Sequence, residues 1–117
     1  MDISIEQRVG VELVRIEGKL DFQASIEATE KLMAALQSSP PGATMIIDAS
    51  ALSYVSSAGL RTLLTLAKSA QTSGRSLAVA AVQPSVQQVL DISGLTKANI
   101  FTLHPTVDAA LQAAGAP

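Results

Sequence analysis

The hydrophobic pattern of this chain changes its period, and that change restricts the folds open to it. Residues 3–7 and 11–16 alternate apolar and polar side chains, as half-buried strands do, and Val9-Gly10 between them predicts a turn. After this hairpin, short apolar runs alternate with stripes at three- and four-residue spacing, which are typical of amphipathic helices. Such alternation predicts an α/β domain with a mixed, largely parallel sheet and about four helices packed on it.

Three aliphatic runs and four helical stripes follow the hairpin. The runs, expected to be strands, are residues 44–48, 76–82 and 99–102. The stripes are Ile26, Thr29, Leu32, Met33 and Leu36; Leu60, Leu63, Leu64 and Ala67; Val86, Val89 and Leu90; and Val107, Ala110 and Leu111. Gly74 is expected to end the second helix, Pro84 to begin the third and Thr106 to cap the fourth. The segment from 48 to 60 is expected to be a polar loop, and residues 1–117 to form one domain.

Composition excludes most enzyme classes and most nucleic-acid-binding proteins. The chain has no cysteine, which excludes disulfides, thiol catalysis and zinc sites built on cysteine. Aromatic residues make up 3% and the formal net charge is -2, so neither a base-stacking platform nor a phosphate-binding surface is expected. The glycines form neither a P-loop nor a dinucleotide-binding motif. We therefore expect no enzymatic activity, no cofactor, no metal and no nucleic-acid partner.

The single histidine, His104, does not restore a catalytic or metal site. Two histidine ligands cannot come from one chain, and no G-x-S-x-G motif accompanies a possible Ser-His-Asp set. We expect an exposed histidine beside Pro105 in a loop. The acidic N-terminus lacks the basic region of an export signal, and the longest apolar run, 77–82, is far shorter than the roughly 20 residues of a membrane helix. The expected location is the cytoplasm, without membrane insertion.

The segment before the second helical stripe contains two serines, Ser56 and Ser57. It runs from the carboxyl end of a predicted strand to a helix N-terminus, where ligands and functional loops gather in open α/β sheets. Serine is a leading N-cap residue worth about 1 kcal/mol, so capping is the interpretation that position alone favours. A helix N-terminus also tolerates an added phosphate of roughly -1.5 to -2 charges, so phosphorylation is the second interpretation.

Two acidic residues, like Ser56 and Ser57, lie at predicted junctions between strands and helices. Asp21 precedes the first helix and Asp48 ends a predicted strand. Helix entry and a hydrogen bond within the loop are their ordinary structural roles. If the strands before them are adjacent, both acids share the sheet edge that carries Ser57.

Five segments, in this order, resemble one known family. They are Gly18-Lys19-Leu20-Asp21, Ile46-Ile47-Asp48, Tyr54-Val55-Ser56-Ser57-Ala58-Gly59-Leu60, Gly94-Leu95 and Val107-Asp108-Ala109-Ala110-Leu111. The chain resembles the STAS domain family, and within it the stand-alone bacterial anti-sigma factor antagonists. The resemblance covers nearly the whole chain and implies the STAS fold.

In that family, a serine before a small residue and a glycine is phosphorylated by a partner kinase. The kinase is itself the anti-sigma factor and has a histidine-kinase-like ATPase fold. The resemblance implies that Ser57 is the acceptor. Ser56 stands where many members have aspartate, which makes it a secondary candidate, and Ala58 stands where many have serine or threonine. The implied partner-binding and acceptor-flanking residues are Asp21, Asp48, Ser56, Ala58, Gly59 and Leu60.

The mechanism that the resemblance implies is partner switching in transcription regulation. Unphosphorylated protein binds the anti-sigma factor kinase and frees a sigma factor, phosphorylation of Ser57 ends the binding, and a serine phosphatase resets the state. One alternative keeps the fold but makes the protein a non-switching subunit or scaffold, for example of a lipid-transport ATPase complex or a stress-sensing assembly. Two others are a small nucleotide-binding or hydrolytic protein, and an interaction domain in which both serines only cap the helix.

Overall fold

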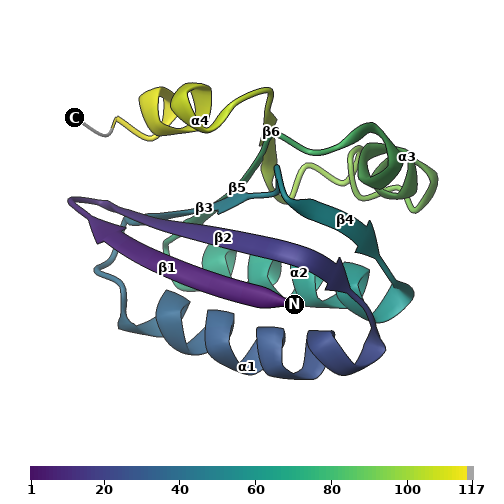
Figure 1. Cartoon of the computed structure of the whole chain (residues 1–117). Coiled ribbons are helices and arrows are strands. Elements are labelled where there is room, and N and C mark those ends of the chain that lie inside the picture. The colour runs from purple at the N-terminus through teal and green to yellow at the C-terminus, as the bar shows by residue number, and fades with distance from the viewer. Residues whose placement is uncertain (116–117) are drawn as a thin grey trace.

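In the computed structural model, which describes residues 1–115, the alternating N-terminal segments form the predicted hairpin (Figure 1). Strand β1 (Asp2–Arg8) pairs antiparallel with β2 (Val11–Leu20), and Arg8 is opposite Val11 at the turn. Gly10 in this turn has a φ of 75°, a conformation that costs glycine little. The turn glycine therefore fixes the register that buries one face of β2.

The other strands are parallel, as the strand–helix alternation predicts. They are β3 (Thr44–Asp48), β4 (Leu52–Val55), β5 (Ser76–Ala80) and β6 (Thr102–His104). The main order is β1-β2-β3-β5-β6, and β4 lies off this path and pairs with β2. The sheet is thus mixed, with its only antiparallel pair at the N-terminal hairpin among the described strands.

Four helices cover the sheet: α1 (Phe22–Ser38), α2 (Ser57–Thr72), α3 (Pro84–Ile92) and α4 (Val107–Ala113). Figure 1 shows α1 and α2 side by side on one face of the sheet and α4 on the other. The larger core cluster lies between the sheet and α1 and α2 and includes Val86 and Leu90 of α3, and a smaller one lies beneath α4. Because buried apolar area is the main stabilising contribution, the α1–α2 face contributes most to the stability of the fold.

The predicted helix boundaries are confirmed by local geometry. Gly74 has a φ of +73° just after α2, and Pro84 occupies the first turn of α3. The Thr106 hydroxyl accepts a hydrogen bond from Ala109 N at 3.0 Å and caps α4. Within the described residues, no helix is both long and apolar enough to cross a membrane.

Two strand predictions need correction. The segment predicted as a strand at 99–102 pairs only from Thr102 onward, since Asn99 has a φ of 58° that extended backbone does not allow. At the other end, the strand predicted to reach residue 82 stops at Ala80, because Ala81 has a φ of 59°. Aliphatic composition alone did not reveal either turn.

The expected loop between 48 and 60 contains a strand, β4. Its buried residues are Leu52 and Val55, which are three residues apart and do not show the period-two pattern of a strand. The strand forms because β2 continues past β3 and offers unpaired backbone groups, and a register shift between Gly18 and Lys19 lets β4 pair there. This pairing depends on tertiary structure and was not visible in the sequence.

Ile26, which the first helical stripe predicts to face the core, lies at the surface of α1. Ile26 is 56% exposed, whereas the buried face of α1 consists of Ser25, Ala28, Leu32 and Leu36. Ser25 and Ala28 take the core-facing positions in this part of the helix, so Ile26 lies on the exposed side of α1. The Ile26 side chain is therefore an exposed aliphatic group on α1 that does not contribute to the core.

Candidate functional site

The pairing of β4 with β2 brings the starts of two helices together. Leu20, the last residue of β2, is opposite Val55, the last residue of β4. Figure 1 shows β2 passing into α1 and β4 passing into α2 at the same end of the sheet. The backbone N–H of Ser56 donates to the carbonyl oxygen of Leu20 at 3.0 Å. The two helix N-termini and their capping residues are thereby held side by side.

Ser56 is the N-cap of α2 and is also bonded to β2. Its Oγ accepts a hydrogen bond from Gly59 N at 3.1 Å and donates one to the Leu20 carbonyl at 3.1 Å. The side chain is half-buried. Both hydrogen-bonding functions of this hydroxyl are used inside the protein, so the capping interpretation is correct for Ser56.

Ser57 is the first residue of α2, and its side chain is exposed. Its hydroxyl makes no hydrogen bond to any of residues 1–115. The first backbone N–H groups of a helix carry a partial positive charge, which favours an anion at this position. The site can therefore accept a phosphate without loss of an existing contact.

Gly59 allows the close approach of α2 to β2. A Cβ atom at this position would lie 2.7 Å from the Leu20 carbonyl oxygen and 2.9 Å from Cγ1 of Val55. Gly59 is buried, and its neighbour Leu60 is half-buried against the main core. Gly59 and Leu60 therefore hold the N-terminus of α2 in place. Ala58, between Ser57 and Gly59, is half-buried.

The two predicted acids have different positions. Asp21 is the N-cap of α1, where its Oδ1 accepts from Ala24 N at 2.9 Å, and it directly follows Leu20 beside Ser56. Asp48 ends β3 opposite Arg15 of β2, five residues before Leu20. At roughly 3.3 Å per residue, this places Asp48 about 17 Å along β2 from the level of Leu20 and Val55, which precede Ser56. The structure brings Asp21 to the serines, and it gives Asp48 a local hydrogen bond to Ser50 N at 3.0 Å.

An apolar groove adjoins Ser57, and sequence reasoning missed it. Its volume is about 390 Å³, and it runs between α1 and α2 with Phe22, Ile26, Ala58 and Arg61 in its wall. Phe22 is 69% exposed and Ile26 is 56% exposed. A hydrogen bond of 2.7 Å between the hydroxyls of Thr29 and Thr62 joins the two helices at this groove. Phe22 and Ile26 thus place two exposed apolar side chains on one surface, a feature that protein-binding surfaces often have.

The described residues give little support for a metal site or for chemistry at the histidine. Among residues 1–115, no group of three or more His, Cys, Asp or Glu side chains is placed to hold a metal ion. His104 lies in β6, and its Nε2 is 3.0 Å from the hydroxyl of Thr102. Its strand position and half-buried side chain correct the expectation of an exposed histidine in a loop. What the site combines is an exposed hydroxyl, a helix N-terminus and an apolar surface.

Three comparisons with known proteins fit this geometry. The model of the STAS domain matches residues 2–110. The anti-sigma F factor antagonist of Paenibacillus polymyxa is 31% identical over 97 residues, which cover 83% of this chain and 82% of that protein. The crystal structure of an anti-sigma factor antagonist from Mycobacterium paratuberculosis is 28% identical, with a TM-score of 0.84 over 97% of this chain and 93% of that one.

A more distant solved structure shares the fold. It is the Bacillus cell fate determinant SpoIIAA in its phosphorylated form, 21% identical, with a TM-score of 0.71 over 96% of this chain and 98% of that one. The predicted family is confirmed by the family model, by the relative from Paenibacillus polymyxa and by the mixed sheet with its N-terminal hairpin. This chain belongs to the STAS domain family.

Proposed function

We propose that the protein is an anti-sigma factor antagonist that works by phosphorylation-controlled partner switching. With Ser57 unphosphorylated, it binds an anti-sigma factor that is also a serine kinase of histidine-kinase-like ATPase fold. The relatives that are 31% and 28% identical are both anti-sigma factor antagonists, which supports this general role. The observation that carries the proposal is the exposed, uncommitted hydroxyl of Ser57 beside the apolar groove.

The hydrogen bonds around the two serines favour Ser57 as the acceptor. A kinase must reach the hydroxyl oxygen, and the Ser56 hydroxyl is half-buried and bonded to Gly59 N and Leu20 O. Phosphorylation of Ser56 would break the cap of α2 and its bond to β2. Phosphorylation of Ser57 leaves both in place.

A phosphate on Ser57 would change the surface that the partner contacts. It adds roughly -1.5 to -2 charges at the rim of an apolar groove. Binding then requires removal of water from this charge, and each 1.4 kcal/mol of that cost lowers the affinity about tenfold. Arg61, four residues further along α2, lies one turn from the phosphate and is placed to pair with it. The state is reset by a serine phosphatase.

Phosphorylation mapped by mass spectrometry tests the proposed acceptor. The protein is incubated with ATP and an anti-sigma factor kinase from the same genome, and we expect one phosphate on Ser57. Ser57→Ala should prevent the modification, whereas Ser85→Ala should not, because Ser85 is an exposed serine in the first turn of α3, away from the groove. A phosphate on Ser56 would instead support the secondary candidate.

The same variants separate switching from the alternative functions. Ser57→Ala should bind the kinase persistently, and Ser57→Glu should bind it weakly. Equal binding by the wild type and both variants would contradict switching and favour a scaffold. Copurification with a lipid-transport ATPase would identify the protein as a subunit of such a complex, and ATP turnover by the purified domain alone would show that it is an enzyme.

A further inference from the structure

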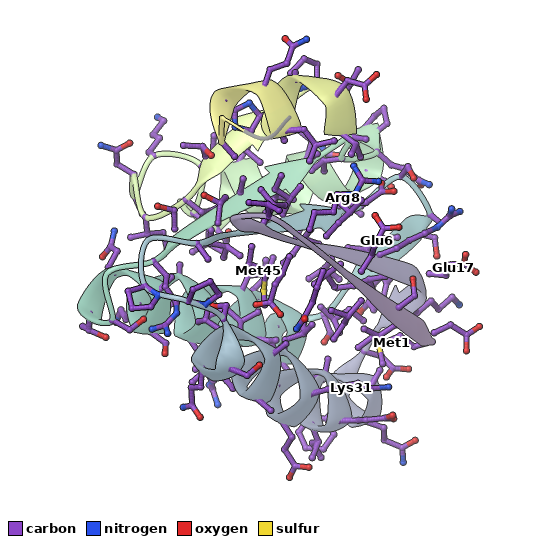
Figure 2. The ribbon with its side chains drawn as sticks, turned by 90° about the vertical axis from the view of Figure 1, so that its left-hand side faces the viewer. Met1, Glu6, Arg8, Glu17, Lys31 and Met45 are labelled. Carbon is purple, nitrogen blue, oxygen red and sulfur yellow. The ribbon has the colours of Figure 1, made fainter. Side chains whose placement is uncertain are left out.

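One arginine, Arg61, lies in the wall of the apolar groove, and its side chain is exposed. The other three arginines of the chain have partners within the fold, and these pairs are Arg8 with Glu6, Arg15 with Glu17, and Arg75 with Ser39. Figure 2 shows the first of these pairs at the hairpin. Arg61 forms no ion pair with any of residues 1–115. Its guanidinium group is therefore available to a group from outside the fold.

The turn of α2 that carries Ser57 and Arg61 is anchored to α1. Thr62, the residue after Arg61, is 3% exposed. Its hydroxyl lies 2.7 Å from the Thr29 hydroxyl of α1 and 3.2 Å from the Ala58 carbonyl oxygen. Because this turn is held on both sides, Ser57 and Arg61 keep the four-residue spacing at which helical side chains are neighbours.

A partner that covers the groove has to provide a counter-charge for Arg61. Glu30 is the only carboxylate in the described wall of the groove, and it forms no ion pair with Arg61. The partner would remove water from the guanidinium group, and a charge that loses its water without a counter-charge is costly. An acidic side chain of the partner opposite Arg61 avoids this cost. Arginine is also among the residue types that contribute most to binding at protein interfaces.

A phosphate on Ser57 would offer Arg61 a counter-charge within its own helix. It carries roughly -1.5 to -2 charges and can accept two hydrogen bonds from one guanidinium group. The positive end of α2 favours the phosphate at the same place. Once paired with the phosphate, Arg61 no longer offers its charge to an acidic side chain of the partner.

We propose that Arg61 is the residue through which phosphorylation of Ser57 releases the partner. In the unmodified protein, Arg61 binds an acidic side chain of the anti-sigma factor at the groove, and in the phosphorylated protein the phosphate takes the place of that side chain. This inference rests on the proposed function, in which the anti-sigma factor covers the groove. The matching surface of the partner then consists of an apolar side chain against Phe22 and Ile26, beside a carboxylate against Arg61.

Phosphorus-31 NMR tests the pairing of Arg61 with the phosphate and needs no kinase. Phosphoserine is incorporated in place of Ser57 during translation, and the second pKa of the phosphate, ordinarily about 6, is measured by titration. A guanidinium group beside the phosphate stabilises the dianion, so Arg61→Gln should raise this pKa by about 0.5. Lys68→Gln is the matched control and should leave the pKa unchanged, because Lys68 is an exposed cation further along α2. The same pKa in the wild type and in Arg61→Gln would overturn the proposal.

Calorimetric titration with the anti-sigma factor kinase, in the absence of ATP, tests the pairing of Arg61 with the partner. Without phosphate, Arg61→Gln should bind about tenfold more weakly than the wild type, and Lys68→Gln should bind equally well. With phosphate on Ser57, Arg61→Gln should cause little further loss, because the phosphate already holds the guanidinium group. No loss in the unmodified form, or an equal loss in both forms, would overturn the proposal.

Failure of the proposed function has a different signature in the same experiments. The phosphorylated and unmodified wild-type proteins would then bind the kinase equally well, whereas the pKa of the phosphate would still respond to Arg61→Gln. Failure of the inference about Arg61 alone would leave the wild type sensitive to phosphorylation. The two results are therefore distinguishable.

Discussion

At the scale of single residues, Ser56 and Ser57 are adjacent but have different hydrogen-bonding environments. The Ser56 hydroxyl joins Gly59 N to the Leu20 carbonyl, whereas the Ser57 hydroxyl is exposed. Ser56 is a structural residue by this criterion. Ser57 is available for modification, and stability measurements can separate the two roles.

We expect Ser56→Ala to lower the free energy of unfolding by about 1 kcal/mol, because the cap of α2 is lost. Ser57→Ala should stay within about 0.5 kcal/mol of the wild type, as is usual for an exposed residue without a contact. Urea unfolding of both variants measures the difference. Equal effects of the two substitutions would contradict the assignment of the cap to Ser56.

Gly59 provides a second test at this scale. Gly-to-Ala inside a helix ordinarily stabilises by about 1 kcal/mol, because glycine loses more backbone entropy on folding. Here the added Cβ would lie 2.7 Å from the Leu20 carbonyl oxygen. We expect Gly59→Ala to destabilise the protein by about 1–3 kcal/mol, the usual cost of overpacking. An unchanged or higher unfolding midpoint would show that α2 can move away from β2 without cost.

At the scale of elements, the sequence predicted those that carry their own local signals. The hairpin and the four helices have clear periodicity and capping residues, such as Gly10 at the turn and Pro84 at the start of α3. The four-residue β4 does not, because it exists only through its pairing with β2. The same holds for the candidate site. Position and motif predict Ser56 and Ser57. No local pattern predicts the groove, because it depends on how α1 packs against the rest of the fold.

Helix α3 and the turn after it are linked through Asp91. Its Oδ1 accepts from Thr96 Oγ1 at 2.7 Å and from Gln87 Nε2 at 2.9 Å. The hydrogen bond from Thr96, then that from Gln87, and the charge of Lys97 hold the pKa of Asp91 below its ordinary value of 3.8. A lowered pKa in the folded state stabilises the protein at pH values above the ordinary one. This contribution is lost as the pH falls through the lower, folded-state value.

We therefore expect Asp91→Asn to lower the urea midpoint at pH 7. The difference from the wild type should begin to shrink as the pH falls below 3.8, where the carboxyl of the unfolded chain takes up its proton. It should disappear below the lower pKa of the folded state, where both forms are neutral. Urea unfolding of both proteins across this pH range is the measurement. A difference that stays constant with pH would mean that the charge of Asp91 does not contribute.

At the scale of the whole molecule, the fold places the proposed switch and the proposed docking surface together. β2 and β4 end side by side, so α1 and α2 begin side by side, and Phe22 of α1 lines the same groove as Ala58 of α2. The formal net charge of the chain is only -2. A phosphate of roughly -1.5 to -2 charges on Ser57 would therefore come close to doubling it at one end of the molecule.

The groove makes its own prediction. We expect Phe22→Ala to weaken binding to the anti-sigma factor at least tenfold, as truncation of a central aromatic residue often does, with little loss of stability. Ile92→Ala is the matched control, because Ile92 is 79% exposed on α3, away from the groove. Isothermal titration calorimetry measures both affinities. Equal effects of the two substitutions would place the docking surface elsewhere.

The affinity of the anti-sigma factor kinase for this protein, with and without phosphate on Ser57, tests the central claim most directly. Both forms are titrated with the same kinase at the same salt concentration, after mass spectrometry has verified one phosphate on Ser57. We predict that the unmodified protein binds at least tenfold more tightly, which corresponds to 1.4 kcal/mol or more. Equal affinities of the two forms would contradict partner switching at Ser57.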